Sequence, residues 1–376
     1  MPRINTIFFQ TDAKLRIALV AVYLSMGVIL GSTASAQSTD STNQESLKNR
    51  IFGLPVAFFA PETSWGFGAA GIYAFRIPGD TADSQIQAVA VYTLQEQLLL
   101  YAPFQIRWDQ NRYFSYGEIG YYRYVYQFYG IGNPALLEAQ EFYEVDFPRI
   151  RLNWLRRVRS NLFIGLRYWF ENYKITEVAP DGLLANENIT GNRGGLNSSP
   201  GIIAIYDSRN NVFFPERGWY VESSLQHDNS WTGSDFNYTT FTVDASTYFT
   251  TAWNHVVALN GYGVFQRGEP PFHLLEMLGG SRKLRGYFEG RFRDKNLLLG
   301  QVAYRSPLFW RIGAVAFLGY GGVAPQIADF SLNDFLLAGG AGLRFTLDPE
   351  KGINIRFDAG FGQGTSGYYL TIGEAF

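Results

Sequence analysis

Apolar and polar residues alternate along most of the chain after residue 50. In the segment 353–361 the odd positions are apolar, whereas Asn354, Arg356 and Asp358 occupy even positions. The segment 340–347 repeats this pattern. Since successive side chains of a strand point to opposite faces, a period of two predicts β-strands with one apolar and one polar face.

Segments of this kind recur about 16 times. An even number of antiparallel strands, each as long as the ~9–11 residues that cross a bilayer, is typical of bacterial outer-membrane barrels. A soluble β-sandwich would alternate as well, but it would bury its apolar face. We therefore predict an all-β fold, a transmembrane antiparallel β-barrel of about 16 strands. The predicted strands cover residues 51–60, 64–77, 84–95, 97–107, 112–128, 141–156, 160–178, 198–208, 217–228, 236–250, 254–267, 295–309, 311–324, 335–347, 352–363 and 367–376.

The connections between these segments fall into a short class and a long class. Short turns at the periplasmic end and long loops outside are the rule for such barrels. The connection that we expect to be large and structured is 268–294. The other longer connections are 129–140, 179–197, 229–235 and 325–334.

Composition narrows the classes of function. The chain has 376 residues, with 31 Lys and Arg against 33 Asp and Glu, a formal net charge of −2, and no Cys. Near-neutral charge argues against a nucleic-acid binder, and the lack of Cys excludes disulfide scaffolds and thiol chemistry. The mean hydropathy of −0.09 excludes a polytopic helical membrane protein, which needs several apolar runs of ~20 residues.

The first residues resemble a secretory signal peptide. Lys14 and Arg16 precede the apolar run 17–30, and a small-residue site, Ala34-Ser35-Ala36, follows. The run is short for a membrane anchor, which is the alternative interpretation. We therefore predict that the protein is exported to the bacterial outer membrane and that its chain has three regions. They are a signal peptide over 1–36, a polar periplasmic tail over 37–50 and the barrel over 51–376.

The last strand also carries a signal. Tyr368, Leu370, Ile372 and Phe376 are spaced to share one apolar face, and this arrangement looks like the β-signal that the barrel assembly machinery reads. An ordinary edge strand that ends in Phe is the alternative. Glu374 interrupts the apolar face near its end, where we expect its charge to reach headgroup water.

One loop motif carries a family resemblance. Within 279–287 stands Leu284-Arg285-Gly286-Tyr287, which resembles the (V/L)-R-G-(F/Y) signature in the sixth loop of the BamA/TamA superfamily, the bacterial surface antigen family. The resemblance covers about residues 51–376, with motifs in family order. The further matching segments are 128–133, 207–210, 214–218, 304–308, 342–344 and 356–358.

The resemblance implies a 16-stranded barrel with the sixth loop inserted into its lumen. A guanidinium in such a confined space needs acceptors, so Arg285 should have a carboxylate partner. At the positions where better-known members carry acidic residues, this chain has Ala303 and Gly319. Asp358 is our first choice as partner of Arg285. The other candidates on the lumenal face are Glu171, Glu222 and Asp244.

The resemblance also implies a function in membrane assembly or translocation, as an insertion or translocation barrel for membrane proteins or lipids. The segment 37–50 is too short for a POTRA domain, so we expect a barrel-only member. The implied partners are outer-membrane lipid, the barrel assembly machinery during biogenesis and, where one exists, a POTRA-bearing or periplasmic protein. A passive or plugged pore, a structural barrel without insertase activity, is the alternative.

The first strand contains Pro55, which has no N–H for a ladder bond. In insertases of the family the seam between the first and last strands opens, and Pro55 fits a loosened seam. A harmless position beside the first turn is the alternative.

No catalytic or phosphate-binding motif is present, and the three His residues are scattered. We therefore predict no enzymatic activity, no metal and no cofactor.

Overall fold

The computed structural model describes residues 49–376 except 61–63, 81–82, 133–138, 187 and 350–351. The predicted signal peptide and nearly all of the polar tail lie outside the described residues. Within the described part, sixteen strands form one sheet. Its strands are β1 (Arg50–Ala60), β2 (Ser64–Phe75), β3 (Ser84–Thr93), β4 (Leu98–Trp108), β5 (Tyr113–Phe128), β6 (Glu141–Arg159), β7 (Leu162–Val178), β8 (Gly195–Asp207), β9 (Gly218–Asp228), β10 (Tyr238–Thr250), β11 (Val256–Gly268), β14 (Asn296–Phe309), β15 (Ile312–Ala324), β16 (Leu336–Asp348), β17 (Ile353–Gly362) and β18 (Thr365–Ile372).

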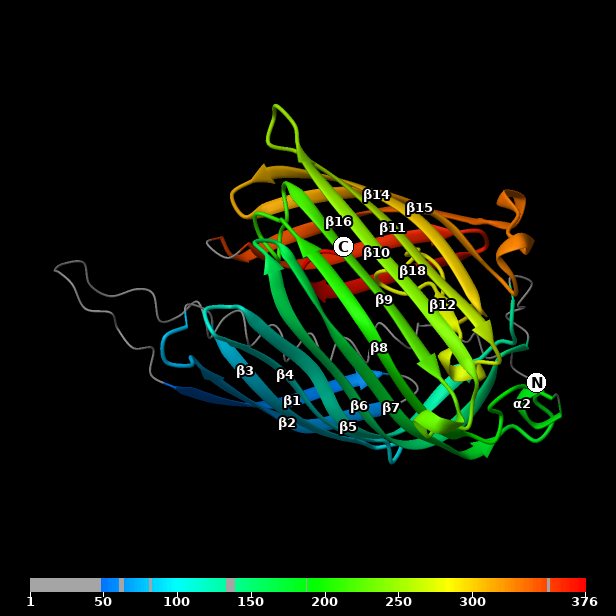
Figure 1. Cartoon of the computed structure of the whole chain (residues 1–376). Coiled ribbons are helices and arrows are strands. Elements are labelled where there is room, and N and C mark those ends of the chain that lie inside the picture. The colour runs from blue at the N-terminus through cyan, green and yellow to red at the C-terminus, as the bar shows by residue number, and fades with distance from the viewer. Residues whose placement is uncertain (1–48, 61–63, 81–82, 133–138, 187, 350–351) are drawn as a thin grey trace.

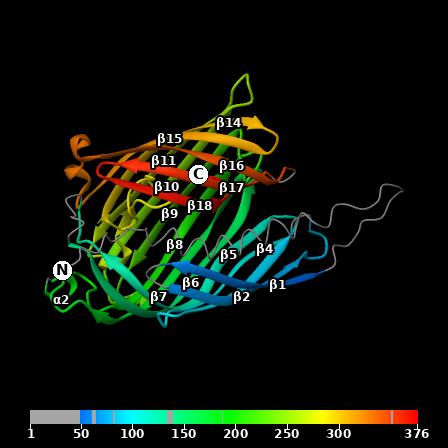
Figure 2. The same ribbon diagram turned by 180° about the vertical axis from the view of Figure 1, so that it is seen from behind.

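Each strand pairs antiparallel with the next one along the chain, and the sheet curls into a barrel (Figures 1 and 2). A second, two-stranded sheet, β12 (Glu276–Leu278) with β13 (Phe292–Asp294), belongs to the connection between β11 and β14. The predicted all-β antiparallel barrel of about 16 strands is thus confirmed. In the sheet order of the described residues, β1 and β18 are the two end strands.

Period-two alternation sets the two faces of the barrel wall. On β17, Arg356 and Asp358 point inward and are buried, whereas Phe357 and Phe361 point outward and are exposed. The outer face therefore presents apolar side chains and the inner face holds the charges. No helix in the described part of the chain is both long and apolar enough to cross a membrane.

The inner face differs from one side of the barrel to the other. On β2–β4 many inward residues are apolar, among them Ile72, Val89, Val91 and Leu99, although Gln87 and Thr93 of β3 also point inward. The strands β14–β18 instead turn arginines and carboxylates inward. The contrast between the two faces is consequently weaker in β2–β4, where many residues of both faces are apolar.

The two ends of the barrel carry different connections. Turns such as 160–161 and 310–311 are short, and we call this the short-turn end; in Figure 1 it lies at the left. The connections 179–194, 229–237, 269–295 and 325–335 are longer, and we call their end the long-loop end. Small helices decorate the long connections, namely α2 (Leu183–Asn186), η2 (Ser230–Thr232), η3 (Phe272–Leu274), η4 (Ile327–Asp329) and η5 (Leu332–Asp334).

Candidate functional site

The connection 269–295, here called the inner loop, folds back inside the barrel. Both ribbon views show its yellow trace enclosed by the curved sheet (Figures 1 and 2). Within it, Leu278, Leu284 and Tyr287 are almost completely buried and pack with Leu297 and Leu299 of β14. The inner loop therefore occupies the lumen instead of extending into solvent.

The tip of the inner loop turns sharply at the motif Leu284-Arg285-Gly286-Tyr287. Leu284 has φ +57° and Gly286 has φ +120°, and both values lie in the left-handed region. The second position in particular requires glycine. These turns direct the Arg285 side chain toward the inner face of β17.

Arg285 meets Asp358, the partner named first from the sequence. Its Nη1 donates to Asp358 Oδ2 at 2.6 Å, and the two side chains are 2% and 0% exposed. The guanidinium carbon also lies 3.5 Å from the ring centroid of Phe317. A charge-assisted hydrogen bond and a cation–π contact together fix the Arg285 side chain.

Asp358 is shared by two further arginines. Arg344 Nη1 donates to its Oδ1 at 2.6 Å, and Arg356 Nε lies 3.5 Å from its Oδ2. Arg356 also donates to Thr371 Oγ1 at 2.7 Å and to the carbonyl of Ser281 in the inner loop at 3.1 Å. One buried carboxylate thus links β16, β17 and the loop tip.

The other residues of the motif are bound to the wall as well. Gly286 N–H donates to Tyr369 Oη at 2.9 Å. The Tyr287 hydroxyl donates to the carbonyl of Leu337 at 3.1 Å and accepts from Gln363 N–H at 2.9 Å. Leu284 N–H donates to Gln301 Oε1 at 3.3 Å. We call Leu284–Tyr287 with these partners the arginine anchor.

Glycines on the inner wall make room for the arginine anchor. A Cβ at Gly360 would lie 2.7 Å from the Arg285 carbonyl, and one at Gly362 would lie 2.5 Å from the Tyr287 ring. A Cβ at Gly319 would lie 2.9 Å from Leu284 Cδ1. A larger side chain at position 319 would therefore need the Leu284 side chain to move aside.

The other carboxylates considered as partners of Arg285 are engaged elsewhere. Glu171 pairs with Arg149 at 2.8 Å, and Glu222 pairs with Arg167 at 2.7 Å. Asp244 Oδ1 accepts from Asn260 Nδ2 at 2.7 Å.

The inner loop has a second attachment near its beginning. The Phe272 ring is 1% exposed and packs edge-on against Phe128 and Tyr143, each 5.3 Å away between ring centroids. His273 stacks on Tyr173 at 3.7 Å with both ring nitrogens buried, and burial lowers the pKa of His273 to about 3. We call Phe272–Leu275 on β5–β7 the aromatic anchor.

The C-terminal residues correct one prediction. β18 ends at Ile372, because Gly373 adopts φ +77° and turns the chain. Tyr368 and Leu370 are exposed on the outer face, but Phe376 leaves the strand and packs on a buried cluster that includes Tyr248. The expectation that Phe376 extends the apolar face of the last strand was wrong.

The expectation for Glu374 was also wrong. Its side chain is 3% exposed and accepts two hydrogen bonds of 3.0 Å from Arg344 Nε, and Arg305 Nε lies 3.6 Å away. Arg305 also donates to the carbonyls of Pro215 and Phe376, at 3.1 and 2.8 Å. The segment 373–376 and the turn 208–217 thus meet at the short-turn end of the lumen.

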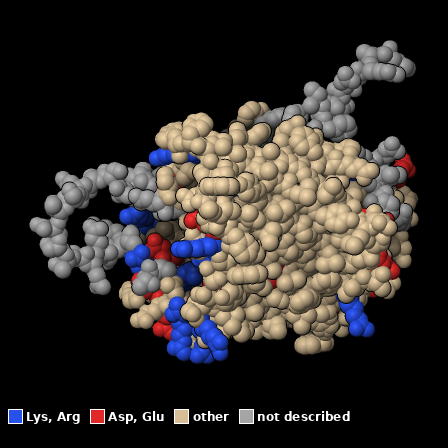
Figure 3. Space-filling view, turned by 90° about the horizontal axis from the view of Figure 1, so that it is seen from above, with Lys and Arg blue, Asp and Glu red and all other residues tan. Residues whose placement is uncertain are grey.

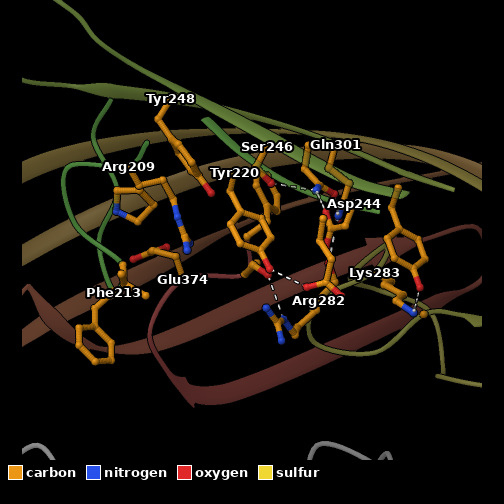
Figure 4. Close-up of a pocket in the computed structure, with 18 of the residues that line it drawn as sticks. Arg209, Phe213, Tyr220, Asp244, Ser246, Tyr248, Arg282, Lys283, Gln301 and Glu374 are labelled. Atoms are coloured by element: carbon orange, nitrogen blue, oxygen red, sulfur yellow. Dashed lines mark hydrogen bonds between the residues drawn. The ribbon is translucent and has the colours of Figure 1, made fainter. Parts of the chain in front are cut away.

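A cavity of about 580 Å³ lies beside the inner loop (Figure 4). Its labelled lining includes Tyr220, Asp244 and Arg282, with Lys283 at one side. Lys283 Nζ donates to Tyr262 Oη at 3.1 Å and pairs with Glu276. The lining mixes both charges, which suits water and polar solutes better than an apolar ligand. In the described part of the chain, no cluster of three or more His, Asp or Glu could hold a metal ion.

Pro55 lies on β1 opposite Ala69 of β2 and is exposed.

Sequence reasoning placed Arg285 and Asp358 together but missed the aromatic anchor, Arg305 and Tyr369. Arg305 lies within the matching segment 304–308, but nothing in the pattern of either residue named its partner.

Comparison with known proteins bears on the whole chain. The model of the Omp85 superfamily domain matches residues 22–376. The fold is similar to that of BamA from Haemophilus ducreyi lacking POTRA domains 1-3, with a TM-score of 0.58 and 13% identity over 87% of this chain and 68% of that one. None of the curated proteins matches the sequence.

Two further solved structures share the fold. CdiB from Acinetobacter baumannii has a TM-score of 0.52 and 14% identity, and CdiB from Escherichia coli has a TM-score of 0.53 and 12% identity. The matches cover 83% and 86% of this chain but only 56% and 61% of those chains. At these identities the likeness concerns the fold alone.

Proposed function

The chain belongs to the Omp85 superfamily and is an outer-membrane β-barrel, and from this premise we propose that it inserts or translocates membrane proteins or lipids through the edge between β1 and β18. The observation that carries the proposal is the position of these strands at the two ends of the sheet order, with Pro55 in β1. A proline cannot donate a ladder bond, so it weakens pairing to whichever neighbour it faces.

The inner wall next to β1 supports the same proposal. Ile72, Val89 and Val91 line the inside of β2 and β3, so a client that enters beside β1 meets apolar side chains. Lipid cannot satisfy open strand edges, so any opening must be filled by the client itself. A partner that delivers clients from the periplasm belongs to this proposal.

Cysteine crosslinking tests whether the seam must open. The natural chain has no Cys, so G53C with L370C places one thiol on β1 and one on the outer face of β18. G53C with G71C, which are Cα partners across β1 and β2, is the positive control for thiol reaction. The proposal predicts that the β1–β18 crosslink stops activity and that reduction restores it.

Activity is measured in vesicles that contain the purified protein. One arm follows the folding of a urea-unfolded eight-stranded barrel protein, and the other follows the transfer of a fluorescent phospholipid between leaflets. Activity above empty vesicles in either arm, lost on β1–β18 crosslinking but kept in the β1–β2 control, supports the proposal. Equal activity with and without the β1–β18 crosslink would overturn it.

A plugged barrel without insertase activity is the second candidate. The observations that favour it are the inner loop within the lumen and, at the short-turn end, the hydrogen bonds that join Arg305 to Pro215 and Phe376. Planar-bilayer recording separates the candidates. A plug predicts rare, small openings that become large and steady when residues 279–291 are replaced by a short Gly-Ser linker, with no client folding in either form.

A further inference from the structure

Three aromatic rings stack across the outer face of β4–β6 near the short-turn end. Trp108 and Tyr113 lie 5.5 Å apart between centroids, and Tyr113 and Trp154 lie 5.9 Å apart, with nearly parallel planes. Trp154 is 45% exposed. Rings of this kind mark the level at which a barrel wall meets lipid headgroups.

Arg156 lies on the same outer face, one position beyond Trp154. It is opposite Tyr113 on β5 and opposite Ile164 on β7, and it is exposed. Val158, the next outward residue, is 50% exposed. The guanidinium of Arg156 is therefore surrounded by apolar side chains on a surface that faces lipid.

More arginines follow at the rim. Arg112, Arg157 and Arg159 lie beside Arg156, where β6 ends and the β4–β5 turn passes. Arg157 Nη2 donates to the carbonyl of Gln110 at 2.9 Å, and Arg112 faces Asp109 at 3.7 Å. In the described part of the chain, neither Arg156 nor Arg159 has a carboxylate within ion-pair distance. Four cations thus share one carboxylate.

The charge is confined to one end of these strands. β6 begins with Glu141, Glu144 and Asp146 at the long-loop end and finishes with the arginines. Figure 3 views the molecule from above, onto the wall opposite β4–β6, and most of the Lys and Arg of that view also lie at the short-turn end. The asymmetry selects one membrane leaflet.

We propose that Arg112, Arg156 and Arg159, here called the basic rim, bind the phosphate groups of anionic phospholipid in the leaflet at the short-turn end. A guanidinium on a lipid-facing surface without a protein carboxylate needs an external acceptor, and phosphate oxygens match its fork of donors. The excess of cations favours lipids with net negative charge over zwitterionic ones. The stacked rings hold the wall at the depth where these phosphates lie.

Native mass spectrometry of the full chain, released from detergent, tests the proposal. The probes are phosphatidylglycerol and phosphatidylcholine of equal chain length, offered at equal concentration. The wild type should retain more phosphatidylglycerol, and R156Q/R159Q should lower this preference by about 25-fold, because each of the two arginines near an anionic headgroup contributes about fivefold. R156K/R159K, which keeps the charge, should retain most of the preference.

The matched control is R193Q/R267Q, which removes two exposed arginines at the long-loop end. The heat-dependent mobility shift on gels confirms that each variant is folded before lipid is added. An equal loss in the control variant, or no preference in the wild type, would overturn the proposal. Retention of added inorganic phosphate in place of lipid would overturn it as well. Since this assay involves no client, its result is independent of the proposed insertion activity.

Discussion

The inner loop is held at two places by different physics. At the arginine anchor, Arg285 reaches Asp358 through one directed, charge-assisted contact of 2.6 Å. At the aromatic anchor, Phe272 is buried among the rings of Phe128 and Tyr143 without any ionic contact. The first anchor depends on the partner's charge, and the second depends on apolar area removed from water.

This difference determines how each anchor can fail. Removing the carboxylate at the arginine anchor leaves buried guanidiniums without a partner. The loss of stability then includes a desolvation penalty that no ion pair offsets. Removing a ring at the aromatic anchor leaves a cavity whose effect depends on how far the neighbours relax. Single polar substitutions at the tip of the inner loop should therefore lower stability strongly. At the beginning of the loop, the loss of stability should follow the volume of the side chain that is removed.

Asp358→Asn should have the largest effect. The side chain keeps its shape but leaves Arg285, Arg344 and Arg356 without their shared carboxylate, which should lower the free energy of unfolding by about 4 kcal/mol. Urea unfolding in detergent measures the change. Asp329→Asn, in the long connection 325–335, is the control. A loss no larger than that of the control would show that the anchor is not electrostatic.

Phe272→Ala should follow, with a loss of about 3 kcal/mol from the cavity among Phe128, Tyr143 and Tyr173. The same urea titration applies. Phe272→Leu, which keeps most of the apolar volume, should lose less than half as much. If the two substitutions were equally harmful, the rings' specific geometry would matter more than their buried area.

Acidification should weaken the aromatic anchor. The pKa of His273 falls from its usual 6.5 to about 3 in the folded chain, because burial disfavours the charged ring. The stability that comes from burying the neutral His273 ring is fully present above pH 6.5 and is lost as the pH falls toward 3. Between pH 7.5 and pH 5 the wild type should lose about 1–2 kcal/mol more than His273→Phe. Parallel pH profiles of the two proteins would contradict the assignment.

Tyr287→Phe should have the smallest effect, about 1 kcal/mol, because it removes only the hydroxyl that bonds Leu337 and Gln363. Conductance in planar bilayers should stay close to that of the wild type. A steady open channel in this variant would mean that the hydroxyl, and not the Arg285–Asp358 pair, keeps the tip in place.

The sequence predicted the barrel and the arginine anchor but not the aromatic anchor. Alternation reports which face a residue occupies, and the loop motif resembles a known signature, so Arg285 and Asp358 could be paired. Phe272 lies outside any strand, in a stretch with two prolines, and no period reveals what a loop aromatic contacts. Glu374 and Phe376 were misplaced because the alternation was continued through Gly373, where the backbone leaves the strand.

The buried segment 373–376 also sets an order of events during folding. Each hairpin of the barrel joins neighbours in sequence, whereas Arg305 reaches Phe376 across 71 positions and Arg293 reaches Gln127 across 166. Contacts that close such long intervals form late, after the local pairings have reduced the entropy of closure. The pairing of Glu374 with Arg344 and Arg305 therefore forms only after β14, β16 and the last strand have come together, so it marks a late step in the folding of this part of the barrel.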